Sequence, residues 1–377
     1  PTLRPREVPT PGNFTVAGNP ATITWRLGDV VHSTPTAVSR PAEGYHLLYQ
    51  DGTYAAYYNE HEHRRHVIYF GGNDGMVHAL NAGYYDENNL AFRRGYDKDT
   101  YTFSDIGPEL GAELWAYVPY NLLPHLKCML DPEYQHKYFV DLKPRIFDVQ
   151  IFKNSPDSLG HVKGWGTIMV VGMRFGGART LAQDIIDEVA PGAYTDSRIF
   201  TSAYMVFDIS DPLKPRLLGE MTFDSASSVD LAYTAAVPAV VPIKGDADTS
   251  DWYLILGSGP TDVTGVSSQK PRIGMFPLSQ FDSPSTYAFR IPATKDTITH
   301  TTAGSWVLDG SANGFVADTV TVDYDLDELF KADVVYFGTV EGDWGGWGGH
   351  LYRWVTDESD PQSWWEPKPM IDAKRPV

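Results

Sequence analysis

Four aspartates lie close together in the segment VDYDLDELFKADVVYF, which runs from Val322 to Phe337. Three of them, Asp323, Asp325 and Asp327, occupy alternate positions, and Asp333 precedes a β-branched run. Carboxylates at this spacing repel one another unless water screens them or a hard cation binds them. The residue types therefore indicate either a metal site or a solvated acidic turn, and the segment alone leaves both open.

The segment NEHEHRRH offers a second possible metal site. Imidazoles at this spacing can hold zinc or nickel, and the segment contains three of them, His61, His63 and His66. Arg64 and Arg65 lie in the same segment and oppose the binding of a cation. We therefore favour a charged hairpin tip between the AAYY and VIYF segments over a metal site.

Composition limits the class of protein. The chain has 377 residues, of which 42% are hydrophobic, so it can build a sizeable core. Its formal net charge of -18 repels phosphate backbones and anionic membranes, and no cluster of lysine and arginine makes a local exception. We therefore exclude nucleic acid as a partner. We also expect no membrane insertion, because no apolar run is long enough to span a bilayer.

Cysteine content and the first residues say little about the compartment. The single cysteine, Cys128, cannot form an internal disulfide and is interpreted as a small buried hydrophobic residue. The chain begins without methionine and shows no signal-peptide pattern. We therefore expect it to be a processed or excised piece of a longer protein.

The elements that position these residues are predicted to be short strands. The sequence has 34 glycines, 27 prolines and an aromatic share of 13%, which favour many strands joined by tight turns. Short apolar runs that end at Gly, Asn or Asp lie at 66–82, 167–173, 203–212, 251–259 and 333–342. Apolar spacing predicts helix only around 121–130 and 178–190.

Several of these runs share one order: a hydrophobic strand, a turn that contains glycine, and a second strand that carries aromatic residues. In the first example the Asn-Asp-Gly of 73–75 predicts a tight hairpin. In the last example WGGWGG at 344–349 looks like an insertion in the same kind of hairpin. Recurrence at irregular spacing favours propeller blades with loop insertions over a β-sandwich. We therefore predict an all-β fold, a modified β-propeller with a few short helices in its insertions.

The order of five motifs resembles a known family. They are LGDVVHSTP (27–35), YFGGNDGMVHALN (69–81), LGAELWAYVPYNLLPHL (110–126), YFVDLKPRIFDV (138–149) and YMVFDISDPLKPRLLGEM (204–221). Together they resemble the C-terminal domain of PilY-type proteins, large secreted factors of type IV pili. The resemblance runs from about Leu27 to about Trp354 and covers nearly the whole chain.

The resemblance implies a fold and a domain organisation. It implies a modified propeller of the quinoprotein alcohol dehydrogenase type, with about seven blades. We assign this propeller to residues 27–377 and a linker or extension to residues 1–26. The resemblance further implies a larger parent protein, often with an N-terminal von Willebrand A-like region.

The resemblance also implies a calcium loop in a late blade. Calcium prefers six to eight oxygen ligands, and Asp323, Asp325 and Asp327 match the first, third and fifth positions of the loop. The family uses a backbone carbonyl at the seventh position, here Leu329, and an aspartate at the ninth, where this chain has Lys331. A two-residue insertion would let Asp333 serve as the ligand of the ninth position, and Glu328 is an alternative donor. The glycine that the family has in the turn of this loop is missing here. We predict Ca²⁺ binding, with a metal-free acidic turn as the alternative.

The function implied is that of a non-catalytic module in type IV pilus assembly, retraction control and tip-mediated adhesion. The expected partners are minor pilins, the pilus tip and a host or abiotic surface. The expected location is the cell surface or the outside of the cell, reached through the periplasm and outer membrane. The alternatives are a quinoprotein-like dehydrogenase and a metal-free interaction propeller. The dehydrogenase would often carry vicinal cysteines, which a single cysteine cannot supply.

The two tryptophans of WGGWGG are candidates for contact with a partner. Trp344 and Trp347 combine large apolar faces with a flexible backbone, which suits a sugar, a pilin or another protein. The alternative is that both rings fold back over the rim of the propeller.

Overall fold

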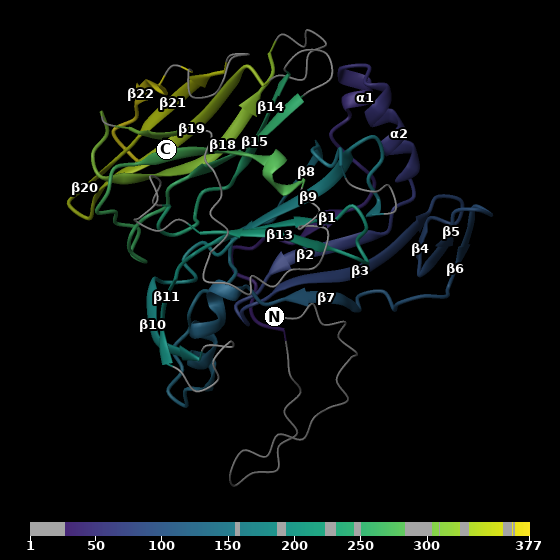
Figure 1. Ribbon diagram of the computed structural model, residues 1–377, viewed down its shortest axis with the longest axis horizontal. Helices are drawn as coiled ribbons and strands as arrows, with labels where there is room; N and C mark the ends of the chain where they lie inside the picture. Colours follow the sequence, from purple (N-terminus) through teal and green to yellow (C-terminus); the bar gives the residue numbers. More distant parts are fainter. Residues whose placement is uncertain are drawn as a thin grey trace.

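Antiparallel β-strands are the main regular secondary structure of this chain in its computed structural model (Figure 1). The structure describes residues 27–154, 159–186, 194–222, 231–244, 250–282, 304–308, 310–324, 332–356, 364 and 366–377. Its helical elements are few and short. The prediction of a mainly β fold is confirmed.

The described strands form four sheets that each contain a four-stranded antiparallel meander. The first contains β1 (Thr36–Val38), β2 (His66–Gly71), β3 (Val77–Asp86) and β7 (Glu113–Tyr117). The second contains β8 (Arg145–Gln150), β9 (Trp165–Gly172), β12 (Tyr204–Asp208) and β13 (Arg216–Met221). The third contains β14 (Ala239–Lys244), β15 (Ser250–Gly257), β16 (Arg272–Pro277) and β17 (Gly304–Val307). The fourth contains β18 (Gly314–Val322), β19 (Val334–Asp343), β21 (His350–Val355) and β22 (Lys368–Asp372).

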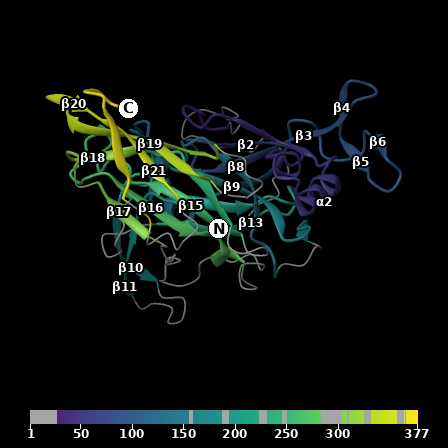
Figure 2. The ribbon, with the colours of Figure 1, turned by 90° about the horizontal axis from the view of Figure 1, so that it is seen from above.

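The blades of β-propellers are four-stranded antiparallel sheets, so the four sheets are consistent with blades. Figure 2 shows the fourth sheet and the first sheet toward opposite sides of the molecule, with strands of the other two sheets between them. The closure of the sheets into a ring and the number of about seven blades stay predictions. The division into residues 1–26 and 27–377 also stays a prediction, and residues 1–26 lie outside the described part.

The two middle sheets bury both faces. On β9, Ile168 and Val170 enter the hydrophobic cluster that also contains side chains of the third sheet. Their neighbours Met169 and Val171 enter the cluster shared with the first sheet. Successive side chains of a strand point to opposite faces, so a strand buried on both sides is a continuous apolar run. This explains why the segment TIMVVGM (167–173) is an almost unbroken apolar run.

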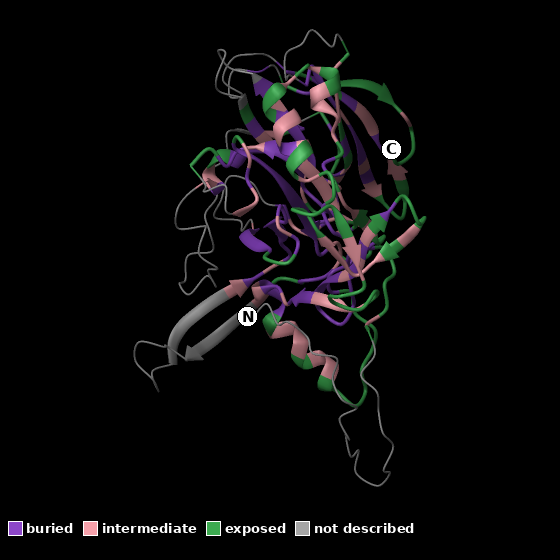
Figure 3. Cartoon of the chain, turned by 90° about the vertical axis from the view of Figure 1, so that its right-hand side faces the viewer, coloured by how far each residue is buried: buried purple, intermediate pink, exposed green. Residues whose placement is uncertain are grey.

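The hydrophobic core consists of three clusters that each lie between consecutive sheets. One joins the first and second sheets, a second joins the second and third, and a third joins the third and fourth. Trp165 and Trp354 are among the largest fully buried side chains. Figure 3 shows this pattern, with buried residues concentrated in the strands and exposed residues on the helices and hairpins around them.

The predicted hairpins are present. The turn between β2 and β3 contains Gly75 with a φ of +87°, a conformation that favours glycine. In the fourth sheet, β20 (Gly346–Gly348) pairs with the end of β19, so WGGWGG forms a short hairpin inserted before β21. Both hairpins were predicted from the sequence.

The helix predicted at 178–190 is wrong. Residues Thr180–Ile186 form β10, which pairs with β11 (Tyr194–Phe200) in a two-stranded hairpin. Hydrogen bonds between the two strands satisfy the backbone N–H and C=O groups that a helix would have satisfied internally. This pairing of strands outweighs the helical spacing of the apolar residues.

A second hairpin, β5 (Gly95–Asp97) with β6 (Thr102–Ser104), follows β4 (Ala91–Arg93), which pairs with the end of β3.

The AAYY segment is helical, which corrects the prediction of a hairpin between AAYY and VIYF. It lies in α2 (Gly52–Glu60), which follows the short α1 (Tyr45–Leu48). The Asp51 carboxylate caps α2 by accepting hydrogen bonds from the amides of Thr53 and Tyr54. This cap supplies the acceptor that the first free amides of a helix require.

The helix predicted around 121–130 is confirmed as a helical segment but of the tighter 3₁₀ form, η1 (Tyr120–Leu130). Pro124 lies inside it and has no backbone N–H to donate. The last described helix is η3 (Leu278–Phe281).

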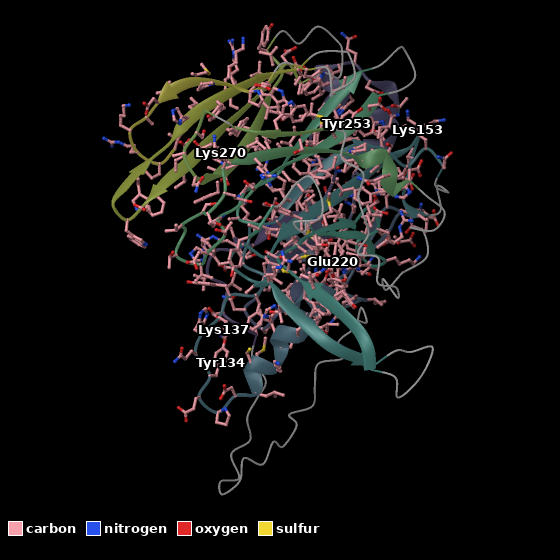
Figure 4. All side chains as sticks on the ribbon, turned by 60° about the vertical axis from the view of Figure 1, so that its left-hand side comes forward. Tyr134, Lys137, Lys153, Glu220, Tyr253 and Lys270 are labelled. Carbon is pink, nitrogen blue, oxygen red and sulfur yellow. The ribbon has the colours of Figure 1, made fainter. Side chains whose placement is uncertain are left out.

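A buried carboxylate holds the start of η1. The side chain of Glu220 accepts hydrogen bonds from the Tyr117 hydroxyl at 2.5 Å and from the amides of Tyr120 and Asn121 at 2.6 and 3.1 Å. Burial raises the pKa of Glu220. Figure 4 labels Glu220 within the packed side chains, close to the base of η1.

Candidate metal site in the acidic loop

The acidic loop connects β18 to β19 in the fourth sheet. The last pair in the register of these strands is Val322 with Val334, and the Asp333 amide donates to the Val322 carbonyl at 3.0 Å. Asp323 and Asp333 therefore begin and end the loop directly beyond the last strand pair. This places two of the five predicted ligands at the base of one loop.

Asp333 is held firmly at this base. Its side chain is 5% exposed, and its Oδ2 accepts a hydrogen bond from the Tyr324 amide at 2.9 Å. Its carbonyl accepts from the amide of Thr356, just beyond β21, at 2.9 Å. The Thr356 hydroxyl in turn donates to the carbonyl of Ala332. The carboxylate position is thus fixed by two neighbouring strand ends.

Asp323 is positioned by a residue distant in sequence. The Tyr49 hydroxyl donates to Asp323 Oδ2 at 2.5 Å. Tyr49 is the residue that ends α1, and its ring packs against Tyr45 with ring centres 5.7 Å apart. Sequence reasoning missed Tyr49, because nothing local in the sequence marks a contact across 274 positions.

The other predicted ligands, Asp325, Asp327 and Leu329, lie outside the described residues, as does Glu328. Within the described part of the chain, no group of three or more His, Cys, Asp and Glu side chains could hold a metal ion. The donors that are described, two carboxylates at one loop base, have the hard oxygen chemistry that calcium prefers. Two such carboxylates fit the chemistry of a calcium site, and calcium binding by this loop stays a prediction.

The three histidines of NEHEHRRH have separate surroundings. His61 Nε2 donates to the Gly160 carbonyl at 2.8 Å, and burial together with the Arg64 charge lowers the pKa of His61 to about 4. The His63 ring lies against Tyr96, and the His66 ring against Phe92, with ring centres 4.8 and 5.4 Å apart. The arrangement does not support the zinc or nickel interpretation.

The two tryptophans of WGGWGG differ in exposure. The Trp344 side chain is 76% exposed, whereas Trp347 is half-buried. Their ring centres lie 5.9 Å apart in an edge-to-face arrangement. The Trp344 ring therefore contacts Trp347 of β20, and the role of both tryptophans in partner contact stays a prediction.

Comparisons with known proteins show what this chain is similar to. No protein-family model matches the chain, and no solved structure matches it. A type IV pilus biogenesis factor PilY1 homolog of Xylella fastidiosa is 26% identical over 248 residues, which cover 63% of this chain and 12% of the relative. The type IV pilus biogenesis factor PilY1 of Pseudomonas aeruginosa strain UCBPP-PA14 is 25% identical over 242 residues, which cover 62% of this chain and 15% of the relative. The chain is a distant homologue of the PilY1 factors.

This homology confirms the resemblance to PilY-type proteins. The chain spans about an eighth to a seventh of the length of these PilY1 relatives. Among the helices that the structure describes, none is long and apolar enough to cross a membrane.

Proposed function

We propose that this chain is a calcium-binding, non-catalytic propeller module of a type IV pilus biogenesis factor. The observation that carries the proposal is the distant homology to the PilY1 factors over 62 to 63% of the chain. The names of those relatives assign them to type IV pilus biogenesis, and we extend that role to this chain. The four blade-like sheets support a propeller scaffold for it.

In this proposal the acidic loop binds the ion. The ligands are four carboxylates and one backbone carbonyl, from Asp323, Asp325, Asp327, Asp333 and Leu329. Bound calcium would supply the positive charge that offsets the repulsion among these carboxylates. The Tyr49 hydroxyl orients Asp323, and the Tyr324 amide orients Asp333, so the loop base is prepared before the ion arrives.

The proposed setting is the bacterial surface. The module would act at the pilus tip after passing through the periplasm and outer membrane, and it would contact minor pilins. Trp344 is the proposed contact for a pilin or for a host or abiotic surface, because a large exposed ring gains most from being covered. Calcium in the loop would adjust the balance between pilus assembly and retraction.

Calcium titration calorimetry on the chelator-treated chain tests the binding step. We expect saturable binding of about one ion per chain, which Asp325→Ala abolishes because it removes one of the loop carboxylates. The matched control is Asp99→Ala, which removes an exposed carboxylate on the β5–β6 hairpin and should leave binding unchanged. Absence of heat in the unchanged protein, or equal binding by Asp325→Ala, would contradict the calcium site.

The pilus role needs its own experiment. The same two substitutions are placed in the full-length protein of a bacterium that assembles type IV pili, and surface piliation is measured. We expect Asp325→Ala to change piliation while the protein level stays normal, and Asp99→Ala to have no effect. Normal piliation without the full-length protein would reject the pilus role whatever the calcium result.

A further inference from the structure

A polar groove of about 750 Å³ lies beside the first sheet, at a distance in sequence from the acidic loop. Its walls come from the C-terminal end of α2 and the turn that follows, from β3, from the β5–β6 hairpin and from the turn after β12. Figure 1 shows this hairpin and α2 at the same end of the molecule, opposite the β20 hairpin. A volume of this size is typical of sites for small ligands.

Arg65 is a buried cation in the wall of this groove. Its side chain is 6% exposed, and its Nη1 donates to Asn81 Oδ1 at 2.7 Å. Its guanidinium carbon lies 4.5 Å from the ring centre of Tyr84. Its Nε is buried and makes no hydrogen bond with any described residue, and no described carboxylate forms an ion pair with it. A buried charge without a counter-ion is costly, so the site favours an anion.

The neutral acceptor beside Arg65 is itself fixed. The Asn81 side-chain amide donates to the carbonyls of Pro108 and Glu109 at 2.8 and 2.9 Å, which turns Oδ1 toward Arg65. The guanidinium is therefore held in one orientation by an amide oxygen and an aromatic face. A preorganised guanidinium is suited to recognise a planar carboxylate.

The positive charge of the neighbouring Arg64 is offset in a different way. Its Nε donates to the Ser39 carbonyl at 2.5 Å, and its Nη1 donates to the Thr167 hydroxyl at 2.9 Å. That hydroxyl donates to Asp148 Oδ1 at 2.6 Å, so a carboxylate lies one hydroxyl away from Arg64. Within the described residues, Arg65 has no carboxylate connected to it through a hydroxyl in this way.

The net charge of the groove is unusual for this acidic chain. Arg64, Arg65 and Lys98 match the three carboxylates that line it, Glu60, Glu62 and Asp211. Lys98 pairs with Glu60 at 3.1 Å. Asp211 pairs with Lys214 at 3.7 Å. In a chain of net charge -18, a groove without net charge is a favourable place for an anionic ligand.

Aromatic rings form the remaining wall. The Tyr96 ring lies 4.8 Å from the His63 ring, centre to centre, and both rings line the groove. Phe103, which does not line the groove, packs against Tyr96 with ring centres 4.9 Å apart. At the tip of the same hairpin, Tyr101 is 75% exposed and has a φ of +54°. A bulky residue in the left-handed region is strained, and such strain is concentrated at binding sites.

We propose that this groove binds a carboxylate-bearing saccharide, with the sugar rings on Tyr96 and Tyr101 and the carboxylate on Arg65. The flat aromatic faces cover the apolar faces of sugar rings, and the guanidinium pairs with the carboxylate. A saccharide is favoured over an acidic peptide because the ligand must place an anion and flat apolar faces within one groove. The proposal goes beyond the calcium site and does not depend on it.

Titration calorimetry with tetragalacturonic acid tests this proposal. The matched ligand is its methyl ester, which keeps the sugar rings and removes the charge. We expect the acid to bind saturably and at least about tenfold more tightly than the ester, because each hydrogen bond to a charged group strengthens binding substantially. A peptide of four glutamates should bind no better than the ester.

Variants separate binding from folding. Arg65→Gln should weaken acid binding by about tenfold or more, and Arg65→Lys should weaken it less, because lysine keeps the charge but loses the planar fork. Tyr101→Ala removes an exposed ring and should weaken binding of both acid and ester without changing Tm. Tyr134→Ala removes an exposed ring that does not line the groove and should leave the binding of both ligands unchanged.

Three results would overturn the assignment. They are equal affinity for the acid and the ester, binding of the acid that Tyr101→Ala leaves unchanged, and tighter binding of the glutamate peptide. The last result would assign the groove to an acidic peptide. No binding at about 1 mM acid would also reject the site, since a groove with a dedicated counter-charge should reach that affinity. None of these results bears on the calcium titration.

Discussion

The hydroxyl of Tyr49 lies 2.5 Å from Oδ2 of Asp323, and this contact joins the end of α1 to the first residue of the acidic loop. It links the N-terminal helices to the fourth sheet. A short hydrogen bond from a phenol to a carboxylate is a charge-assisted contact, stronger than one between neutral groups.

Tyr49→Phe should therefore weaken the proposed calcium site. The substitution removes the donor that orients Asp323, and we expect calcium affinity to fall by about tenfold, as for other losses of a partner that orients a metal ligand. Calcium titration calorimetry measures the change. Tyr58→Phe, which removes a hydroxyl from α2, is the control and should leave the affinity unchanged. Equal affinities for both variants would show that Tyr49 does not orient a ligand.

Asp208→Asn should strongly destabilise the second sheet. Oδ2 of Asp208 accepts from Arg216 Nη2 at 2.5 Å and lies 3.0 Å from His161 Nε2. Burial raises the pKa of Asp208, but the hydrogen bond and charge of His161 and the charge of Arg216 outweigh it and lower the pKa to about 2. Removing the negative charge leaves a buried arginine beside a neutral amide, and we expect the free energy of unfolding to fall by about 3 to 5 kcal/mol.

Urea denaturation measures this loss. The control is Asp211→Asn, three residues further on, where the carboxylate is half-exposed and faces Lys214. This control should cost no more than about 1 kcal/mol. Similar losses for the two variants would mean that the charge of Asp208 is not what matters.

Stability should fall at alkaline pH because of His78. Burial lowers the pKa of this imidazole, but hydrogen bonds to Asp74 and Glu113 at 3.1 and 2.6 Å outweigh burial and raise it to about 9 from 6.5. The folded state therefore holds a proton that the unfolded state releases between these two values. The stabilisation, up to about 3 kcal/mol, is complete below pH 6.5 and is lost as the pH rises through about 9.

Urea midpoints measured between about pH 6 and about pH 10 check this dependence. His78→Gln should flatten the part of the curve between neutral and alkaline pH, although the variant itself is less stable. His136→Gln removes an exposed histidine that faces Asp29 and should leave the slope as it is. A slope that His78→Gln does not alter would assign the pH dependence to another group.

Gly75→Ala should destabilise the turn between β2 and β3. Gly75 has a φ of +87°, and an added Cβ would lie 2.6 Å from Leu126 Cδ2 in η1. We expect a loss of about 2 kcal/mol in the free energy of unfolding, from strain and from displacement of Leu126. Thermal denaturation measures it. Gly52→Ala in α2, where an added Cβ meets no atom within 4 Å, should be neutral or slightly stabilising, and an equal loss there would contradict the argument.

The strands could be predicted from the sequence because most of them are buried apolar runs that end at turn residues. The hairpin of β2 and β3 is an example, since its Asn-Asp-Gly turn has a local conformational cause. Helix α2 could not be predicted in this way, because its aromatic and alanine residues suit either state and Asp51 decides through its cap. The hairpin of β10 and β11 was missed because strand pairing is a non-local choice.

The residues of the candidate sites likewise differ in whether the sequence predicts their position. The positions of Asp323 and Asp333 at one loop base follow from the flanking strands, which the sequence predicts. The contact with Tyr49 and the burial of Arg65 depend on the packing of distant segments, which no local pattern encodes. Sequence reasoning treated Arg65 only as a charge that opposes a metal.

The placement of the three core clusters between sheets has a consequence for any shortened form of this chain. Each sheet looks like a separate module, yet its apolar face is completed only by the next sheet. A cut between two sheets would therefore expose one side of a core to water, and the remaining part would tend to self-associate. The sheets are repeated in form but interdependent in stability, and a fragment for expression is best chosen to keep all four.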